Sequence, residues 1–122
     1  MVFRLTTVTL GASDAVRLAA FYQALLGGET VTDDEGWIVL RTPNSGVSLA
    51  FQREDDYRRP VWPELPGQQQ MMVHLEIEVD DLSAGLAHAL ACGAVLADHQ
   101  PQDDVRVCLD PAGHPFCLWV GQ

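Results

Sequence analysis

The sequence of 122 residues contains no lysine, and all seven of its basic residues are arginine. This absence excludes a Schiff-base lysine and the lysine of a phosphate-binding loop. Against the seven arginines stand 17 acidic residues, which give a formal net charge of −10. Nucleic acids and anionic membranes are bound by basic patches, so neither is an expected partner.

The chain also lacks the long apolar run, of about 20 residues, that a membrane-spanning helix needs. Its first residues do not resemble a signal peptide, and its three cysteines include no C-x-x-C pair. We therefore expect reduced thiols and a cytoplasmic protein. The hydrophobic fraction of 48% is sufficient for a packed core, and the length predicts a single domain over residues 1–122.

Two halves of the sequence follow the same order of elements. A strand-like segment at 5–10 precedes a helix predicted over 15–26, and three short extended runs follow at 29–32, 37–42 and 47–53. A shift of 67 residues superposes this order on a second strand at 73–79, a helix that begins after Asp81, and runs at 94–97, 105–109 and 115–120. Asp14 and Asp81 are expected to cap the two helices. The pattern predicts an α+β fold of two βαβββ modules, at about 3–53 and 73–122.

A linker over residues 54–72 separates the modules and contains Pro60, Pro63 and Pro66. Connections of this length without regular structure are uncommon inside a domain and are often functional. Tyr57 and Trp62 could cover the mouth of a cavity. The alternative is a solvated linker with Trp62 packed on a sheet edge.

Alternation along the strands predicts which side chains share a face. Val73, Leu75, Ile77 and Val79 are expected to face the helix layer, as are Phe116, Leu118 and Val120. The opposite face would then carry polar and aromatic side chains from both modules, as expected of a ligand-holding surface: Thr7, Thr9, Gln52, His74, Glu76, Glu78, Cys117 and Trp119.

Three segments resemble the vicinal oxygen chelate superfamily, which includes glyoxalase I, bleomycin- and fosfomycin-resistance proteins and extradiol dioxygenases. They are the helix start at Ser13-Asp14, the junction from His74 to Val-Asp-Asp-Leu82, and Asp110-Pro-Ala-Gly-His-Pro-Phe-Cys-Leu118. The linker, with Pro-Val-Trp-Pro and Gln-Gln-Met-x-x-His-Leu, is similar to that of the single-domain glyoxalase-like branch common in actinomycetes. The resemblance implies a cup-shaped mixed sheet with helices outside, completed by a second subunit in a homodimer.

The resemblance also implies a divalent metal held by one residue from the first and last strand of each module. The corresponding positions are Thr7, Ala50, His74 and Cys117, of which His74 alone is a usual ligand of the family. We therefore expect no metal cofactor in the usual site. If a metal is bound, the expected ligands are His74, Glu76 and Cys117.

His74 has three possible roles: a pocket histidine bonded to Glu76 or a threonine, a substrate-contacting or acid/base residue, or a metal ligand. Cys117 could form an activated thiolate pair with it. The remaining histidines, His88, His99 and His114, are expected in a helix, a loop and a turn.

Three functional hypotheses follow. The first is a metal-independent binder of the bleomycin-resistance type, which holds an apolar or cationic small molecule through Tyr57, Trp62, Trp119 and the carboxylates. The second is a metal-dependent enzyme, a glyoxalase-like lyase, an isomerase or a dioxygenase acting on adjacent oxygens of a substrate. The third is a structural or regulatory dimer with a vestigial pocket.

Overall fold

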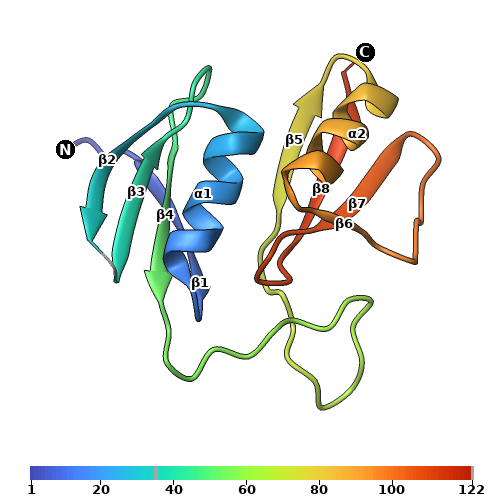
Figure 1. Ribbon diagram of the computed structural model, residues 1–122, viewed down its shortest axis with the longest axis horizontal. Coiled ribbons are helices and arrows are strands. Elements are labelled where there is room, and N and C mark those ends of the chain that lie inside the picture. The colour runs from blue at the N-terminus through green and yellow to red at the C-terminus, as the bar shows by residue number, and fades with distance from the viewer. Residues whose placement is uncertain (35, 122) are drawn as a thin grey trace. The chain divides into compact units, whose positions relative to one another are not determined.

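The computed structural model describes residues 1–34 and 36–121, and its contacts divide the chain into two units, Met1–Tyr57 and Arg58–Gln122. The first unit contains β1 (Thr7–Ala12), α1 (Ala15–Leu26), β2 (Glu29–Asp34), β3 (Trp37–Arg41) and β4 (Ser48–Arg53). The second contains β5 (Leu75–Val79), α2 (Leu82–Cys92), β6 (Val95–Leu96), β7 (Val105–Leu109) and β8 (Pro115–Val120), as Figure 1 shows. The predicted α+β fold of two βαβββ modules is confirmed. The joint cup of the two modules stays a prediction.

Each unit has an open four-stranded mixed sheet of the same topology. The strand orders are β1-β4-β3-β2 and β5-β8-β7-β6, with the first strand of each module parallel to the last. In the first sheet Thr9 is paired with Ala50, and in the second Glu76 is paired with Cys117. Adding 67 to both residue numbers of the first pair gives the second. The internal repeat predicted from the sequence is therefore present in the strand register itself.

Both helices begin at the aspartates that the sequence predicts as caps. The carboxylate of Asp14 accepts a hydrogen bond from the backbone N–H of Arg17, and that of Asp81 accepts one from Ala84. Each thereby satisfies a backbone donor that the first helical turn leaves unpaired. At the end of α2, Gly93 adopts a left-handed φ of 117°, a conformation that glycine takes without steric cost.

In the first unit α1 packs against the neighbouring strands β3 and β4 (Figure 1), and the core lies between them. Leu18 and Tyr22 of α1 are fully buried there, together with Leu40 and Phe51. The rings of Tyr22 and Phe51 are stacked with centroids 5.6 Å apart. Burial of aromatic side chains of this size contributes much of a domain's hydrophobic stabilisation.

In the second unit, a buried aspartate organises the turn between β7 and β8. Asp110 is only 1% exposed, and its Oδ1 accepts hydrogen bonds from the backbone N–H groups of Ala112 and His114, each at 2.9 Å. The backbone N–H of Asp110 also donates to the carbonyl of His114. These bonds fix the residue at which β8 begins, and therefore the register of Phe116 and Cys117 in the sheet.

The strand starts differ from the predicted ones. Val73, expected on the core face, is 63% exposed and precedes β5, which begins at Leu75. The first pair of the β5–β8 ladder joins Leu75 to Phe116, and the residue before Phe116 is a proline, which has no N–H to extend the ladder. Val120, also expected in the core, ends β8 and is exposed.

Among the described residues, no helix has the length and apolar character that would let it cross a membrane.

We predict that Asp110→Ala lowers the free energy of unfolding by about 2–3 kcal/mol, because two backbone donors lose a buried acceptor. Asp110→Asn retains one side-chain oxygen and is expected to lose less. Urea denaturation of the purified variants measures both values. An Asp110→Ala loss below about 0.5 kcal/mol, the size of an ordinary surface substitution, would contradict this role of the aspartate.

Candidate functional site

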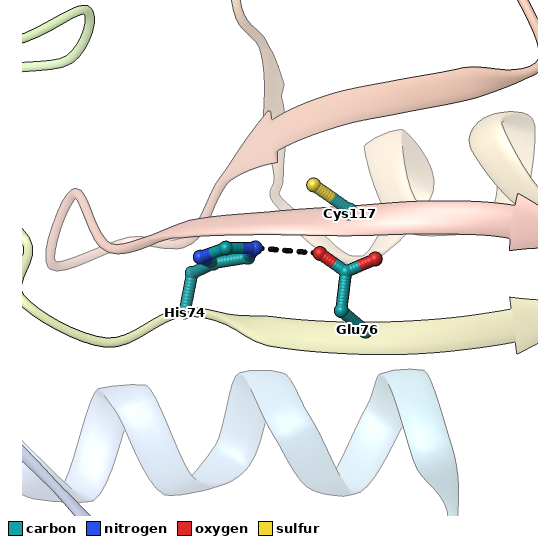
Figure 2. A group of neighbouring side chains, drawn as sticks. All are labelled: His74, Glu76 and Cys117. Atoms are coloured by element: carbon teal, nitrogen blue, oxygen red, sulfur yellow. Dashed lines mark hydrogen bonds and ion pairs between the residues drawn. The ribbon is translucent and has the colours of Figure 1, made fainter.

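Three side chains with donor atoms meet on one face of the second sheet. Glu76 of β5 and Cys117 of β8 are direct partners in the parallel ladder, and neighbouring strands lie about 4.8 Å apart. His74 stands two residues before Glu76, just outside the strand. Figure 2 shows the His74 ring and the Glu76 carboxylate facing each other, with Cys117 on the adjacent strand. The sequence prediction that these three residues share a face is consistent with this placement.

The polar group at the centre of this cluster is the carboxylate of Glu76. Its Oε2 lies 2.5 Å from Nε2 of His74, so the imidazole N–H donates to the carboxylate. Both side chains are partly open to solvent, at 36% for His74 and 51% for Glu76. One donor atom from each of His74, Glu76 and Cys117 lies within 4.8 Å of the other two.

The thiol of Cys117 is not an activated nucleophile in this environment. Burial, followed by the hydrogen bond to Glu76 and the negative charge of that carboxylate, raises the pKa of Cys117 to about 12. The thiol is thus protonated at neutral pH and donates to Glu76 rather than forming a thiolate pair with His74. Cys108 is fully buried on the opposite face, and burial raises its pKa to about 11.

A pocket of about 180 Å³ opens beside the cluster, entirely within the second unit. Most of its wall is apolar, and among the described residues that line it Glu76 alone carries a carboxylate. The lining residues are Trp62, Met71, His74, Glu76, Pro101, Gln102, Val105, Val107, Pro115 and Cys117.

Contacts within the second unit hold the part of the linker that supplies Trp62 and Met71. The guanidinium of Arg59 donates to the carbonyl of Pro111, and its side chain crosses Gly113, where an added Cβ would lie 2.4 Å from the Arg59 Cγ. The ring of Trp62 contacts that of His99 with centroids 5.6 Å apart. Gly113 has a φ of 89°, so its position requires glycine both for the backbone and for the close approach of Arg59.

Five of the predicted ligand-binding residues do not line this pocket. Thr7, Thr9, Gln52 and Tyr57 belong to the first unit, where the Gln52 amide donates to the Glu54 carboxylate. Trp119 lies two residues beyond Cys117 on β8, and its buried Nε1 has no hydrogen-bond partner among the described residues. A role for these five in ligand binding stays a prediction.

Several lining residues were not predicted from the sequence. Met71 comes from the linker and Pro101 and Gln102 from the loop after β6, segments that carry no hydrophobic period. Val105 and Val107 belong to β7, and Val107 is the register partner of Cys117. Pairing β7 with β8 in the sequence would have placed Val107 beside the pocket.

The four positions that the superfamily resemblance implies for a metal do not suit that role in this chain. Thr7 and Ala50 stand on the first sheet, and alanine has no donor atom. His74 remains, with Cys117 at the fourth position. Among the described residues, the donors His74, Glu76 and Cys117 lie together, and all three belong to the second module.

Duplicated βαβββ modules and a polar sheet face with a pocket define the glyoxalase-like class of protein. The glyoxalase-like domain family model matches residues 7–119, and the chain belongs to this family. No curated protein matches the sequence.

Solved structures similar to this chain share its fold at low sequence identity. TnmS3, an antibiotic binding protein from Streptomyces sp. CB03234, is 18% identical with a TM-score of 0.67, over 99% of this chain and 98% of that one. A glyoxalase/bleomycin resistance protein/dioxygenase family enzyme from Burkholderia phytofirmans PsJN is 21% identical, with a TM-score of 0.72 over 97% and 98%. The fosfomycin resistance protein FosX from Mesorhizobium loti is 14% identical, with a TM-score of 0.71 over 100% and 95%.

We predict that iodoacetamide modifies Cys92 before Cys117 at pH 8 in the presence of EDTA. Both side chains are half-buried, but the raised pKa of Cys117 leaves little thiolate. A thiolate of higher pKa is also more nucleophilic, which offsets part of this deficit in thiolate. We therefore expect the alkylation rates of Cys92 and Cys117 to differ on the order of tenfold to a hundredfold. Peptide mass mapping over time measures the rates.

Glu76→Gln is expected to speed the alkylation of Cys117, because it removes the negative charge beside the thiol. In guanidinium chloride the three cysteines should react alike. Equal rates for Cys92 and Cys117 in the folded protein would show that the thiol is not held in its protonated form.

Proposed function

We propose that the protein binds a small molecule of the kind that bleomycin-resistance-type proteins bind, without the metal site usual in the family. The ligand would place an apolar group with a cationic or hydrogen-bond-donating substituent in the pocket of the second unit. The observation that carries this proposal is the pocket itself, in which apolar walls surround the Glu76 carboxylate.

The size of the pocket supports a ring-sized group. An apolar cavity of about 150 Å³ holds benzene, whereas sites for drug-sized molecules are about 300–1,000 Å³. The 180 Å³ pocket thus matches one ring or a compact aliphatic group, with the remainder of a larger ligand outside it. Trp62 offers an aromatic face for stacking or for a cation.

The negative charges of the pocket and of the chain favour a ligand with a cationic or hydrogen-bond-donating group over an anionic ligand. Glu76 supplies a carboxylate to the pocket wall, no other described residue of the wall does so, and the chain carries a formal net charge of −10. An anion would meet repulsion from both, while a positive group could share the carboxylate with His74. His74 would then contact the ligand or exchange a proton with it.

The descriptions of two proteins with similar structures are consistent with a small-molecule-binding role. One is called an antibiotic binding protein, and another is a glyoxalase/bleomycin resistance protein from Streptomyces sp. CB03234. Their fold supports a binding role by analogy, whereas the chemistry proposed here comes from the side chains of this chain.

A metal-dependent lyase, isomerase or dioxygenase is the second candidate, and the donors His74, Glu76 and Cys117 favour it. A divalent ion held there would supply Lewis-acid polarisation of adjacent substrate oxygens.

Benzylamine, benzyl alcohol and benzoate test the binding proposal, because they share one ring and differ in charge. In ligand-observed NMR titrations with EDTA present, we expect benzylamine to bind most tightly and benzoate most weakly. Glu76→Gln should reduce the preference for benzylamine over benzyl alcohol by at least roughly tenfold, because a charge-assisted hydrogen bond contributes about 1.5–3 kcal/mol.

Glu78→Gln is the matched control, since Glu78 lies on the same strand but does not line the pocket. Trp62→Ala should weaken all three compounds. Equal binding of the three, unchanged in Glu76→Gln, would refute a carboxylate-selected pocket.

We further propose that the protein is a cytoplasmic homodimer. The strands β1 and β5 stand at the edges of their sheets, and unpaired edges favour association. The side chains of Val2, Phe3 and Leu5, before β1, are largely exposed and apolar. Light scattering after size-exclusion chromatography should give the mass of two chains at micromolar concentration, and the mass of one chain would contradict the dimer.

A further inference from the structure

The cluster of His74, Glu76 and Cys117 brings a nitrogen, an oxygen and a sulfur donor together on two neighbouring strands. The parallel pairing of Glu76 with Cys117 fixes the carboxylate and the thiol side by side. His74 reaches the same carboxylate from two residues upstream (Figure 2). The backbone positions of two of the three donors are thus set by the sheet before any ligand arrives.

The distances are close to those of a metal site. In a tetrahedral zinc site, metal–ligand lengths of about 2.0–2.3 Å place the donor atoms about 3.3–3.6 Å apart. The three donors here lie within 4.8 Å of one another, and the nitrogen–oxygen pair is at 2.5 Å. A bound ion would require the His74–Glu76 pair, at 2.5 Å, to open, and every other donor separation is already at most 4.8 Å.

We propose that His74, Glu76 and Cys117 form a site for a thiophilic divalent cation of the Zn²⁺ type. Imidazole, carboxylate and thiolate are the three side-chain ligands of zinc, whereas Mg²⁺ and Ca²⁺ select oxygen donors. Three protein donors would leave a fourth position open for water or a substrate, and all three residues line the pocket.

This site differs from the one that the superfamily resemblance implies. It uses one module instead of two, and it takes Glu76 in place of donors at Thr7 and Ala50. It also goes beyond the binding of an organic molecule, because the ion would occupy the position of the ligand's cationic group. The metal and the organic probe are therefore tested separately.

Co²⁺ serves as the spectroscopic probe. Reduced protein, freed of metal with EDTA and then transferred to chelator-free buffer, is titrated with Co²⁺ in the absence of oxygen. We expect saturation at one equivalent, with a thiolate-to-cobalt charge-transfer band in the near ultraviolet. One equivalent of Zn²⁺ should abolish the band, and excess Mg²⁺ should leave it unchanged.

The variants assign the ligands. Cys117→Ser should lose the charge-transfer band. His74→Ala and Glu76→Gln should each weaken Co²⁺ binding by more than about tenfold, because even the loss of a group that only supports a metal ligand costs about 10–100-fold in metal affinity. Cys92→Ser is the matched control. Cys92 Sγ lies 3.7 Å from Nε2 of His88 on α2, so these two residues also bring a sulfur and a nitrogen donor together, outside the proposed site. This variant should retain the band.

A wild-type protein without the band, or a band that survives in Cys117→Ser or disappears in Cys92→Ser, would overturn the site. His74 lies outside the strand and is partly exposed, so His74→Ala remains a folded test even where Cys117→Ser does not fold. Because the benzylamine titrations contain EDTA, their outcome does not depend on this result, and either proposal can fail alone.

Discussion

The parallel pairing of β5 with β8 is the constraint on which the site depends. These strands are the first and last of their module, so α2, β6 and β7 lie between them in the sequence. Their register determines that Glu76 meets Cys117. A slip of one residue would turn Cys117 toward the core and expose Phe116 and Leu118, both now buried. Burial of hydrophobic side chains on one face of the sheet thus fixes the register that pairs Glu76 with Cys117 on the other face.

The turn at Asp110 and the linker contacts extend this constraint to the pocket wall. Asp110 fixes the start of β8, and the same turn provides the Pro111 carbonyl and the glycine against which Arg59 lies. The linker residues Trp62 and Met71 therefore form part of a wall attached to the strand that carries Cys117. A segment without regular structure is placed by a few specific contacts.

Much of this fold could be predicted because its signals are local. A helix capped by Asp14 and ended by glycine shows both its termini in the sequence, and the predicted span of α1 agrees with the observed one. Strand ends were less predictable, since a ladder requires both partners. The alternation at Val73 continues past the point where Pro115 of the partner strand stops the pairing.

The donor cluster could be predicted because its residues follow a periodic pattern in the sequence, whereas most of the pocket wall follows none. His74 and Glu76 share a face through the two-residue period of a strand, and the repeat of the two halves placed Cys117 on that face. The wall instead gathers Met71, Pro101 and Gln102 from segments without a period. Such contacts arise from tertiary folding and leave no pattern in the sequence.

The two modules share a backbone plan but not a chemistry. At equivalent positions the first sheet carries Thr7, Thr9 and Ala50, and the second carries His74, Glu76 and Cys117. The common scaffold therefore cannot by itself decide the function. In the second module the carboxylate is already engaged by an imidazole and a thiol, both donors. An occupant that displaces either donor must supply positive charge or a hydrogen bond of its own, so the organic cation and the metal ion that we propose would compete for the same place.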